Sequence, residues 1–184
     1  MMRKIFILIF LACAFLYSCS ESNTAADWTK KAQKSWDGQQ YKDPQKAVEY
    51  LSKAIELEPA NADTYNRRGT AYYNLGDYQR TIEDDSEAIR LSPEYADAYN
   101  NRGGAYAKLG KYQEAIEDYN QAIRLKPEYA VFYNNRAVAH IKLKNNKQGC
   151  LDAQKACELG DCITLRVAQT KGFCSSETEM LPKE

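Results

Sequence analysis

The sequence has few of the residues on which enzymes and nucleic-acid-binding proteins depend. Basic and acidic residues number 25 each, so the formal net charge is zero and no general attraction to nucleic acid is expected. There is a single histidine, His140, and no phosphate-binding glycine loop, since Arg102-Gly103-Gly104 lacks the spacing of that motif. The carboxylates are distributed as on an ordinary solvated surface. We therefore predict no catalytic residue, no metal site, no cofactor, no nucleic-acid partner and no small-molecule substrate.

The sequence does contain one five-residue motif in three copies, each starting 34 residues after the previous one. The copies are Tyr65-Asn66-Arg67-Arg68-Gly69, Tyr99-Asn100-Asn101-Arg102-Gly103 and Tyr133-Asn134-Asn135-Arg136-Ala137. Each copy runs on through a turn into a second stretch, and the first two of these stretches contain an Ala-Ile pair and end near a proline. This order predicts a helix, a turn and a second helix in each copy. The period and the residue order resemble the tetratricopeptide repeat.

The copy that starts at Ala96 fits the resemblance best. Counted from that residue, it has an aromatic at position 4, glycine at 8, tyrosine at 11, 17 and 24, alanine at 20 and 27, and proline at 32. The copies from Ala62 and Ala130 are looser. Upstream, Trp28 reaches position 4 of an irregular repeat if about three residues are inserted around Asp43-Pro44. The resemblance implies an all-α fold, a right-handed α-solenoid of about four helix-turn-helix repeats with a C-terminal capping helix. His140 stands where the sister copies have tyrosine, so we expect a packed core histidine.

The expected division of the chain follows from this register. It is a signal peptide 1–18, a lipidated tether 19–26, an irregular first repeat 27–61, repeats 62–95 and 96–129, a divergent repeat 130–161, a capping helix with a cysteine-containing end 162–174, and a frayed tail 175–184. Helices are expected at about 27–39, 44–57, 62–75, 78–91, 96–109, 112–125, 130–143, 147–159 and 162–170. Asp43-Pro44 suits an N-cap followed by the first helical residue.

The N-terminus resembles that of a bacterial lipoprotein. An apolar run from Ile5 to Tyr17 follows a short basic start and is shorter than the roughly 20 residues that a spanning helix needs. Leu16-Tyr17-Ser18-Cys19 is similar to the lipoprotein cleavage motif, which implies that Cys19 becomes the N-terminus and carries fatty acyl chains such as palmitate. Ser20 resembles the residue of lipoproteins sent to the outer membrane. The alternatives are a plain signal peptide with an incidental cysteine, or cleavage before Cys13.

Four further cysteines, Cys150, Cys157, Cys162 and Cys174, lie in the last repeat and its cap. An exported chain favours disulfides, and metal binding is the weaker alternative because neither C-x-x-C nor zinc-finger spacing occurs. Cys150 and Cys157 would lie about 10.5 Å apart on one helix, too far for a bridge. Two connectivities remain, Cys150–Cys174 with Cys157–Cys162 or Cys150–Cys162 with Cys157–Cys174. If Gly160-Asp161 turns the chain back, the first, nested pairing follows.

In the family that the chain resembles, positions 2, 5, 6, 9, 12 and 13 of the first helices line a concave groove. The candidate partner-binding residues are therefore Asn66, Arg67, Tyr73, Asn100, Asn101, Lys108, Asn134, Asn135 and Lys142. Amides at position 6, Asn101 and Asn135, could hydrogen-bond the backbone of an extended peptide, although Arg67 interrupts the column. The alternative is that Asn-Arg-Gly is only a common repeat variant. The family's clamp for C-terminal carboxylates is not matched, since Val131 and Asn135 replace its third-repeat lysine and arginine.

An ion pair within each hairpin is also predicted. Arginine at position 7 and aspartate at position 23 recur in every copy and are equally far from the turn, so antiparallel helices bring them level. The pairs are Arg68 with Asp84, Arg102 with Asp118, and Arg136 with Asp152. If partly exposed, each contributes about 1 kcal/mol or less.

The resemblance implies a membrane-anchored, non-catalytic adaptor that binds another envelope protein, or an extended peptide of one, through the groove. The alternative is a structural or self-assembling subunit of an outer-membrane, secretion or pilus assembly machine, and an enzyme is least expected. The expected location is the bacterial cell envelope, with a lipid anchor in the outer membrane.

Overall fold

The computed structural model describes residues 23–38 and 40–174. The expected signal peptide, the lipid-bearing Cys19 and the tail 175–184 lie outside the described residues. Apart from one isolated bridge between Trp36 and Tyr41, the described part is entirely helical in its regular structure. None of its helices is long and apolar enough to cross a membrane. The helices are α2 (Ala25–Gln33), α3 (Pro44–Leu57), α4 (Ala62–Leu75), α5 (Tyr78–Leu91), α6 (Ala96–Lys108), α7 (Tyr112–Leu125), α8 (Ala130–Lys142), α9 (Asn146–Glu158) and α10 (Ile163–Thr170).

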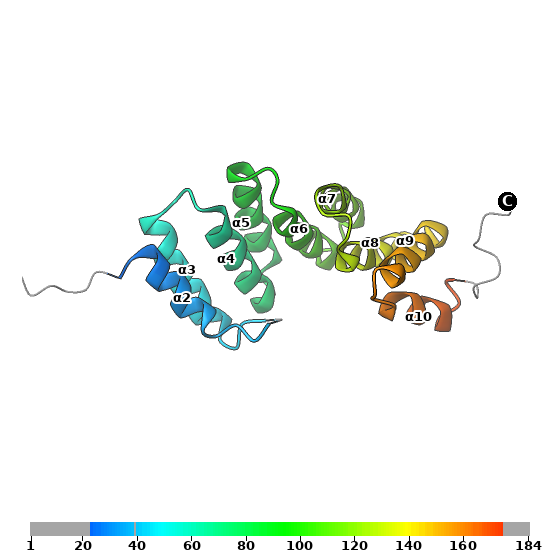
Figure 1. The fold of residues 1–184 in the computed structure, drawn as a ribbon, viewed down its shortest axis with the longest axis horizontal. Helices are drawn as coiled ribbons and strands as arrows, with labels where there is room; N and C mark the ends of the chain where they lie inside the picture. The colour runs from blue at the N-terminus through cyan, green and yellow to red at the C-terminus, as the bar shows by residue number, and fades with distance from the viewer. Residues whose placement is uncertain (1–22, 39, 175–184) are drawn as a thin grey trace, which may run out of the picture.

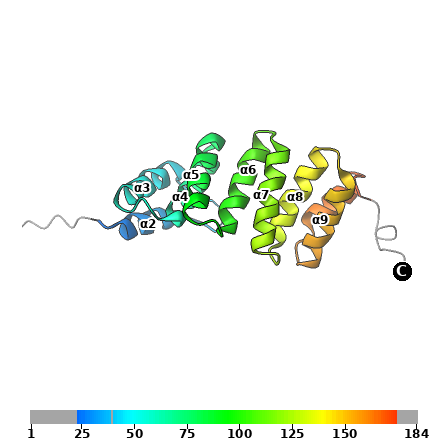
Figure 2. The same cartoon turned by 90° about the horizontal axis from the view of Figure 1, so that it is seen from above.

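Successive helices pack in pairs, and the pairs stack into an elongated array (Figures 1 and 2). The pairs are α2 with α3, α4 with α5, α6 with α7 and α8 with α9, and the second helix of each pair also packs on the first helix of the next. The first helices meet one another as well, α4 with α6 and α6 with α8. At the end opposite α2, α10 packs on α9 and touches α8 (Figure 1). The fold is the right-handed solenoid of about four repeats and a cap.

Local sequence sets where the helices begin. The side chains of Asp43, Asn61 and Asp77 accept hydrogen bonds from backbone N–H groups three residues on, at the starts of α3, α4 and α5. Pro44 occupies the first turn of α3, where its missing N–H costs nothing. The ends of α3, α4, α5 and α7 coincide with the predicted ones, and those of α6, α8, α9 and α10 differ by one residue at one or both ends.

The first helix is where the predicted boundaries are wrong. We expected a helix at about 27–39, but α2 begins at Ala25 and ends at Gln33. Thr24 and Asp27 form a capping box that starts the helix early, so residues 25 and 26, which we expected in the tether, are helical. After Gln33 the chain turns back, and Trp36 packs edge-on against Tyr41 with ring centroids 5.0 Å apart. The extra residues of this irregular repeat therefore form a bend rather than more helix.

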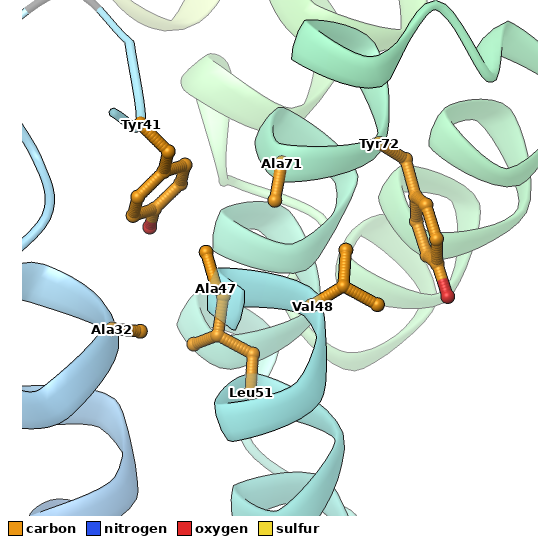
Figure 3. Packing of buried hydrophobic residues seen from close by; sticks show 7 residues of the cluster. All are labelled: Ala32, Tyr41, Ala47, Val48, Leu51, Ala71 and Tyr72. Atoms are coloured by element: carbon orange, nitrogen blue, oxygen red, sulfur yellow. The ribbon is translucent and has the colours of Figure 1, made fainter. Parts of the chain in front are cut away.

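The core is divided into small clusters along the array. The cluster at the N-terminal end joins α2, α3 and α4 through Ala32, Tyr41, Ala47, Val48, Leu51, Ala71 and Tyr72 (Figure 3). Many core positions are alanines that are fully buried, such as Ala115 and Ala122 of α7. Small side chains let helices approach closely, both within a hairpin and between neighbouring repeats.

Candidate functional site

Each of the three hairpins α4–α5, α6–α7 and α8–α9 is closed by a pair of one arginine and one buried aspartate. Two guanidinium nitrogens donate to the two carboxylate oxygens at 2.6 to 2.8 Å in all three copies. The pairs are Arg68 with Asp84, Arg102 with Asp118, and Arg136 with Asp152, which confirms the prediction. The condition for a contribution of about 1 kcal/mol or less, partial exposure, does not hold for the carboxylates, because the three aspartates are only 6%, 5% and 3% exposed.

The same arginines also tie each repeat to the preceding one. Their Nη1 atoms donate to side chains of the preceding second helix, Ser52, Ser86 and Asn120, at 3.0, 3.0 and 2.6 Å. These acceptors are 34 residues apart, a spacing that was visible in the sequence and was missed. Burial raises the pKa of the Asp84 and Asp118 carboxyls, although the facing guanidinium acts in the opposite direction. These pairs, which we call the arginine clamps, are structural.

We call the side chains of α4, α6 and α8 at the predicted groove positions the first-helix face. Two of its expected members do not lie open on it, because Asn66 and Asn134 are only 7% and 8% exposed. Asn66 turns toward α5, where its Nδ2 donates to Asp85 Oδ1 at 2.8 Å. Asn134 Oδ1 is buried without a hydrogen-bond partner among the described residues. The prediction that these two amides line a groove is therefore wrong.

Asn101 and Asn135 instead link neighbouring first helices. Asn101 Nδ2 donates to Thr70 Oγ1 of α4 at 3.0 Å, and Asn135 Nδ2 donates to Asn100 Oδ1 of α6 at 2.8 Å. All four side chains are half-buried. These hydrogen bonds from Nδ2 hold the Asn101 and Asn135 side chains in one orientation. Their carboxamide oxygens can therefore accept hydrogen bonds from the backbone N–H groups of a bound chain.

The N-terminal part of the first-helix face is occupied by its own contacts. Arg67 forms an ion pair with Asp63, and its Nη1 donates to Gln33 of α2 at 2.9 Å. Tyr73 lies beside Gly104, whose Cβ, if it had one, would be 3.5 Å from the tyrosine ring. The interruption of the amide column at Arg67 thus reflects a contact with the irregular first repeat.

The C-terminal part of the first-helix face is more open and more apolar. Val131 and Val138 are each 46% exposed, and with Asn135 between them they form a stripe along α8 at helical spacing. Lys108 and Lys142, the last residues of α6 and α8, are exposed, and Lys142 follows Val138 four residues on along the same stripe. This arrangement can hydrogen-bond a backbone and cover an apolar side chain.

Asp85 is a fully buried carboxyl between α4 and α5. It stands at position 24, where the middle copy has Tyr119, and is 0% exposed. Its Oδ2 atom has no hydrogen-bond partner in the described part of the chain, and burial raises its pKa well above the usual range. Gly69 on the facing helix makes room, since a Cβ there would be 3.1 Å from Asp85 Oδ1. With no access to solvent, Asp85 is a packing feature of the first full repeat.

His140 lies in the last repeat, and the four cysteines lie in that repeat and in the cap that follows it. The His140 side chain is 14% exposed, its Nε2 lies 3.9 Å from Asp152 Oδ2, and burial lowers its pKa, which is the environment of a packed histidine. The structure pairs the cysteines in the nested arrangement, Cys150 with Cys174 and Cys157 with Cys162, with Cα atoms 5.6 and 4.0 Å apart. These bridges hold α10 to the last hairpin at both of its ends.

The comparisons with known proteins agree with this geometry. A tetratricopeptide repeat model matches residues 96–129, and a TPR repeat model matches residues 43–76 and 69–110. A crystal structure of MamA is 26% identical with a TM-score of 0.69, over 79% of this chain and 83% of that one. The Arabidopsis OM64 TPR domain is 28% identical with a TM-score of 0.59, over 62% and 93%. The first TPR of Spaghetti (RPAP3) bound to HSP90 peptide SRMEEVD is 25% identical with a TM-score of 0.62, over 66% and 94%.

No curated protein matches the chain in sequence. Residues 43–129 nevertheless contain tetratricopeptide repeats, and the predicted resemblance is confirmed for them. Tetratricopeptide folds are typical of non-catalytic scaffolds for protein–protein interactions.

Proposed function

We propose that this protein is a lipid-anchored, non-catalytic scaffold that binds an extended segment of another envelope protein on its first-helix face. The observation that carries the proposal is the pair of half-buried amides, Asn101 of α6 and Asn135 of α8, together with the exposed valines on either side of Asn135. The amide orientations are fixed by contacts with the neighbouring repeat, so little freedom is lost when a bound backbone donates to them. Val131 and Val138 then supply apolar surface for a side chain of the partner.

The solved RPAP3 domain binds a peptide from HSP90, which supports a protein partner for a fold of this kind. The chemistry proposed for this chain is different. Val131 stands on α8 where the family's carboxylate clamp has lysine, and Asn135 stands where it has arginine. An apolar side chain within an extended segment fits this part of the face better than an acidic C-terminus.

The anchor is proposed on the sequence of residues 1–20. A lipid on Cys19 would place the array in the cell envelope, with the outer membrane favoured by Ser20. The test is labelling with a radioactive fatty acid in the producing bacterium. The wild-type protein should take up label, and the Cys19→Ala variant should remain unlabelled and uncleaved or be released. Label on Cys19→Ala would overturn the anchor.

The binding proposal is tested with matched substitutions on two helices, α8, which carries part of the first-helix face, and α9, which does not. Val138→Glu adds a negative charge to the first-helix face at a residue that is 46% exposed. The control, Leu151→Glu, adds the same charge on α9 at a residue that is 41% exposed. Partners captured from detergent-solubilised envelope should be purified, and their affinity for each variant measured by calorimetry.

We expect Val138→Glu to weaken binding about tenfold or more, and Leu151→Glu to leave it unchanged. Asn101→Ala with Asn135→Ala should also weaken binding, and should lower stability by about 1 kcal/mol for each lost inter-repeat hydrogen bond. Equal affinity of Val138→Glu and wild type would overturn the proposed face. Association of the protein with itself in place of a partner would favour the structural-subunit alternative.

A further inference from the structure

The outer face of α10 exposes apolar side chains at the end of the array. Ile163 is 62% exposed and Val167 is 47% exposed, four residues apart on one side of the helix. Together with Arg166, Thr170 and Lys171 they line a single surface hollow. The terminal helix of a solenoid normally turns a polar face to water, so these two aliphatic side chains are not explained by capping.

The inner face of α10 packs against the last hairpin and caps the array. Leu165 packs with Ala137 and Ala153, and Ala168 packs with the Cys150–Cys174 bridge. The two disulfides hold the residue just before the helix and a residue four positions after it. The outer face is therefore presented in a fixed position, and a partner that binds it need not order the helix.

The charge of this segment is of one sign. Residues 162–174 contain Arg166 and Lys171 and no aspartate or glutamate. A second copy would bring cations against cations if two α10 helices paired. The other end of the array does not fit either, because α2 and its C-cap expose Lys30 and Lys34 against the one exposed carboxylate of α2, Asp27. The face is complementary to an apolar surface flanked by carboxylates.

We infer that the outer face of α10 is a docking site for an acidic amphipathic helix of another protein. Side chains four residues apart form the ridge that packs into the groove of a facing helix, and Ile163 with Val167 is such a ridge. Arg166 and Lys171 lie on either side of the hollow, where glutamates of the partner helix pair with them. This site is separate from the first-helix face, so one chain can join two proteins.

The test uses the full-length protein in nanodiscs and two fluorescent synthetic peptides. Both peptides are amphipathic helices with the same leucine stripe, flanked by glutamate in one and by lysine in the other. Anisotropy should show the glutamate peptide binding at least about tenfold more tightly, with the difference shrinking at high salt. Arg166→Glu combined with Lys171→Glu should reverse the preference.

Two matched substitutions locate the peptide. Val167→Ser should weaken binding of the glutamate peptide about fivefold or more, and Val138→Ser, at a valine of nearly equal exposure on α8, should not. Equal binding of the two peptides, or loss of binding in Val138→Ser alone, would overturn the inference. Binding of the glutamate peptide that appears only after residues 175–184 are deleted would also overturn it, because the chain's own C-terminus would then be the occupant of α10. Dimerisation of the protein that is lost in Val167→Ser would make a second copy the occupant, and contact of α10 with the bilayer of anionic nanodiscs would make a lipid surface the occupant. Val138→Ser changes the first-helix face and Val167→Ser changes the outer face of α10. A result that overturns the α10 docking site can therefore be told apart from one that overturns the proposed function.

Discussion

Removal of one arginine clamp gives a quantitative test of the architecture. Arg102→Met deletes the guanidinium and leaves Asp118, which is 5% exposed, without its two charge-assisted hydrogen bonds. Breaking a buried ion pair by removing one partner costs about 3–5 kcal/mol. The Arg102 side chain is itself 21% exposed, so water can partly replace it and we expect the lower end, about 3 kcal/mol. For a chain of this size the melting temperature should fall by about 6–12 °C.

The matched control is Arg124→Met. This arginine lies on the exposed surface of α7, donates to Gln121 within its own helix, and should cost less than about 0.5 kcal/mol. Urea unfolding of both variants, followed by circular dichroism at pH 7, measures the difference. Adding Asp118→Leu to Arg102→Met should recover most of the loss, because no buried charge then remains unpaired.

The pH dependence of Arg102→Met decides whether the buried carboxylate is the cause. Burial already raises the pKa of Asp118 in the folded protein, and removal of the guanidinium raises it further. A raised folded pKa means that stability is lost as pH rises above the unfolded value of about 3.9. The loss of unfolding free energy in Arg102→Met relative to wild type should therefore be largest at pH 7 and should shrink as the pH falls toward 4. A loss below about 1 kcal/mol at pH 7, or one that is constant with pH, would refute the reasoning.

Three other predictions concern packing and covalent structure. Gly104→Ala should raise stability by about 0.5–1 kcal/mol, because its Cβ would lie 3.5 Å from a tyrosine ring, an ordinary packing distance. Gly103→Ala should lower stability, because its Cβ would lie 2.8 Å from the buried ring of Tyr119. The melting temperatures of the two variants should therefore shift in opposite directions. Asp85→Asn should gain stability over wild type as pH rises from about 4, because the pKa of the buried carboxyl is raised, and a pH-independent difference in urea titrations would contradict this. Peptide mapping of the exported protein by mass spectrometry should recover the nested disulfides, and four free thiols would contradict them.

The sequence by itself determined the repeat, most helix ends and the ion-pair partners within the three hairpins from α4 to α9. The 34-residue period and the cap at Asp43 depend on residues close in sequence, so they could be predicted without a structure. The arginine clamps follow because two residues equally far from one turn must come level across an antiparallel pair. The same reasoning predicted the nested arrangement of cysteines about Gly160-Asp161 that the structure has.

Only the tertiary structure decided which polar side chains are available to a partner. Asn66 and Asn134 share a groove position with Asn100, yet both are buried and Asn100 is half-buried. The exposure of Ile163 and Val167 was equally invisible in the sequence. Helical periodicity fixes which residues share a face but not how far each hairpin is rotated against the next. That rotation depends on side-chain packing between repeats, and it determines which amides bond internally and which side chains remain open.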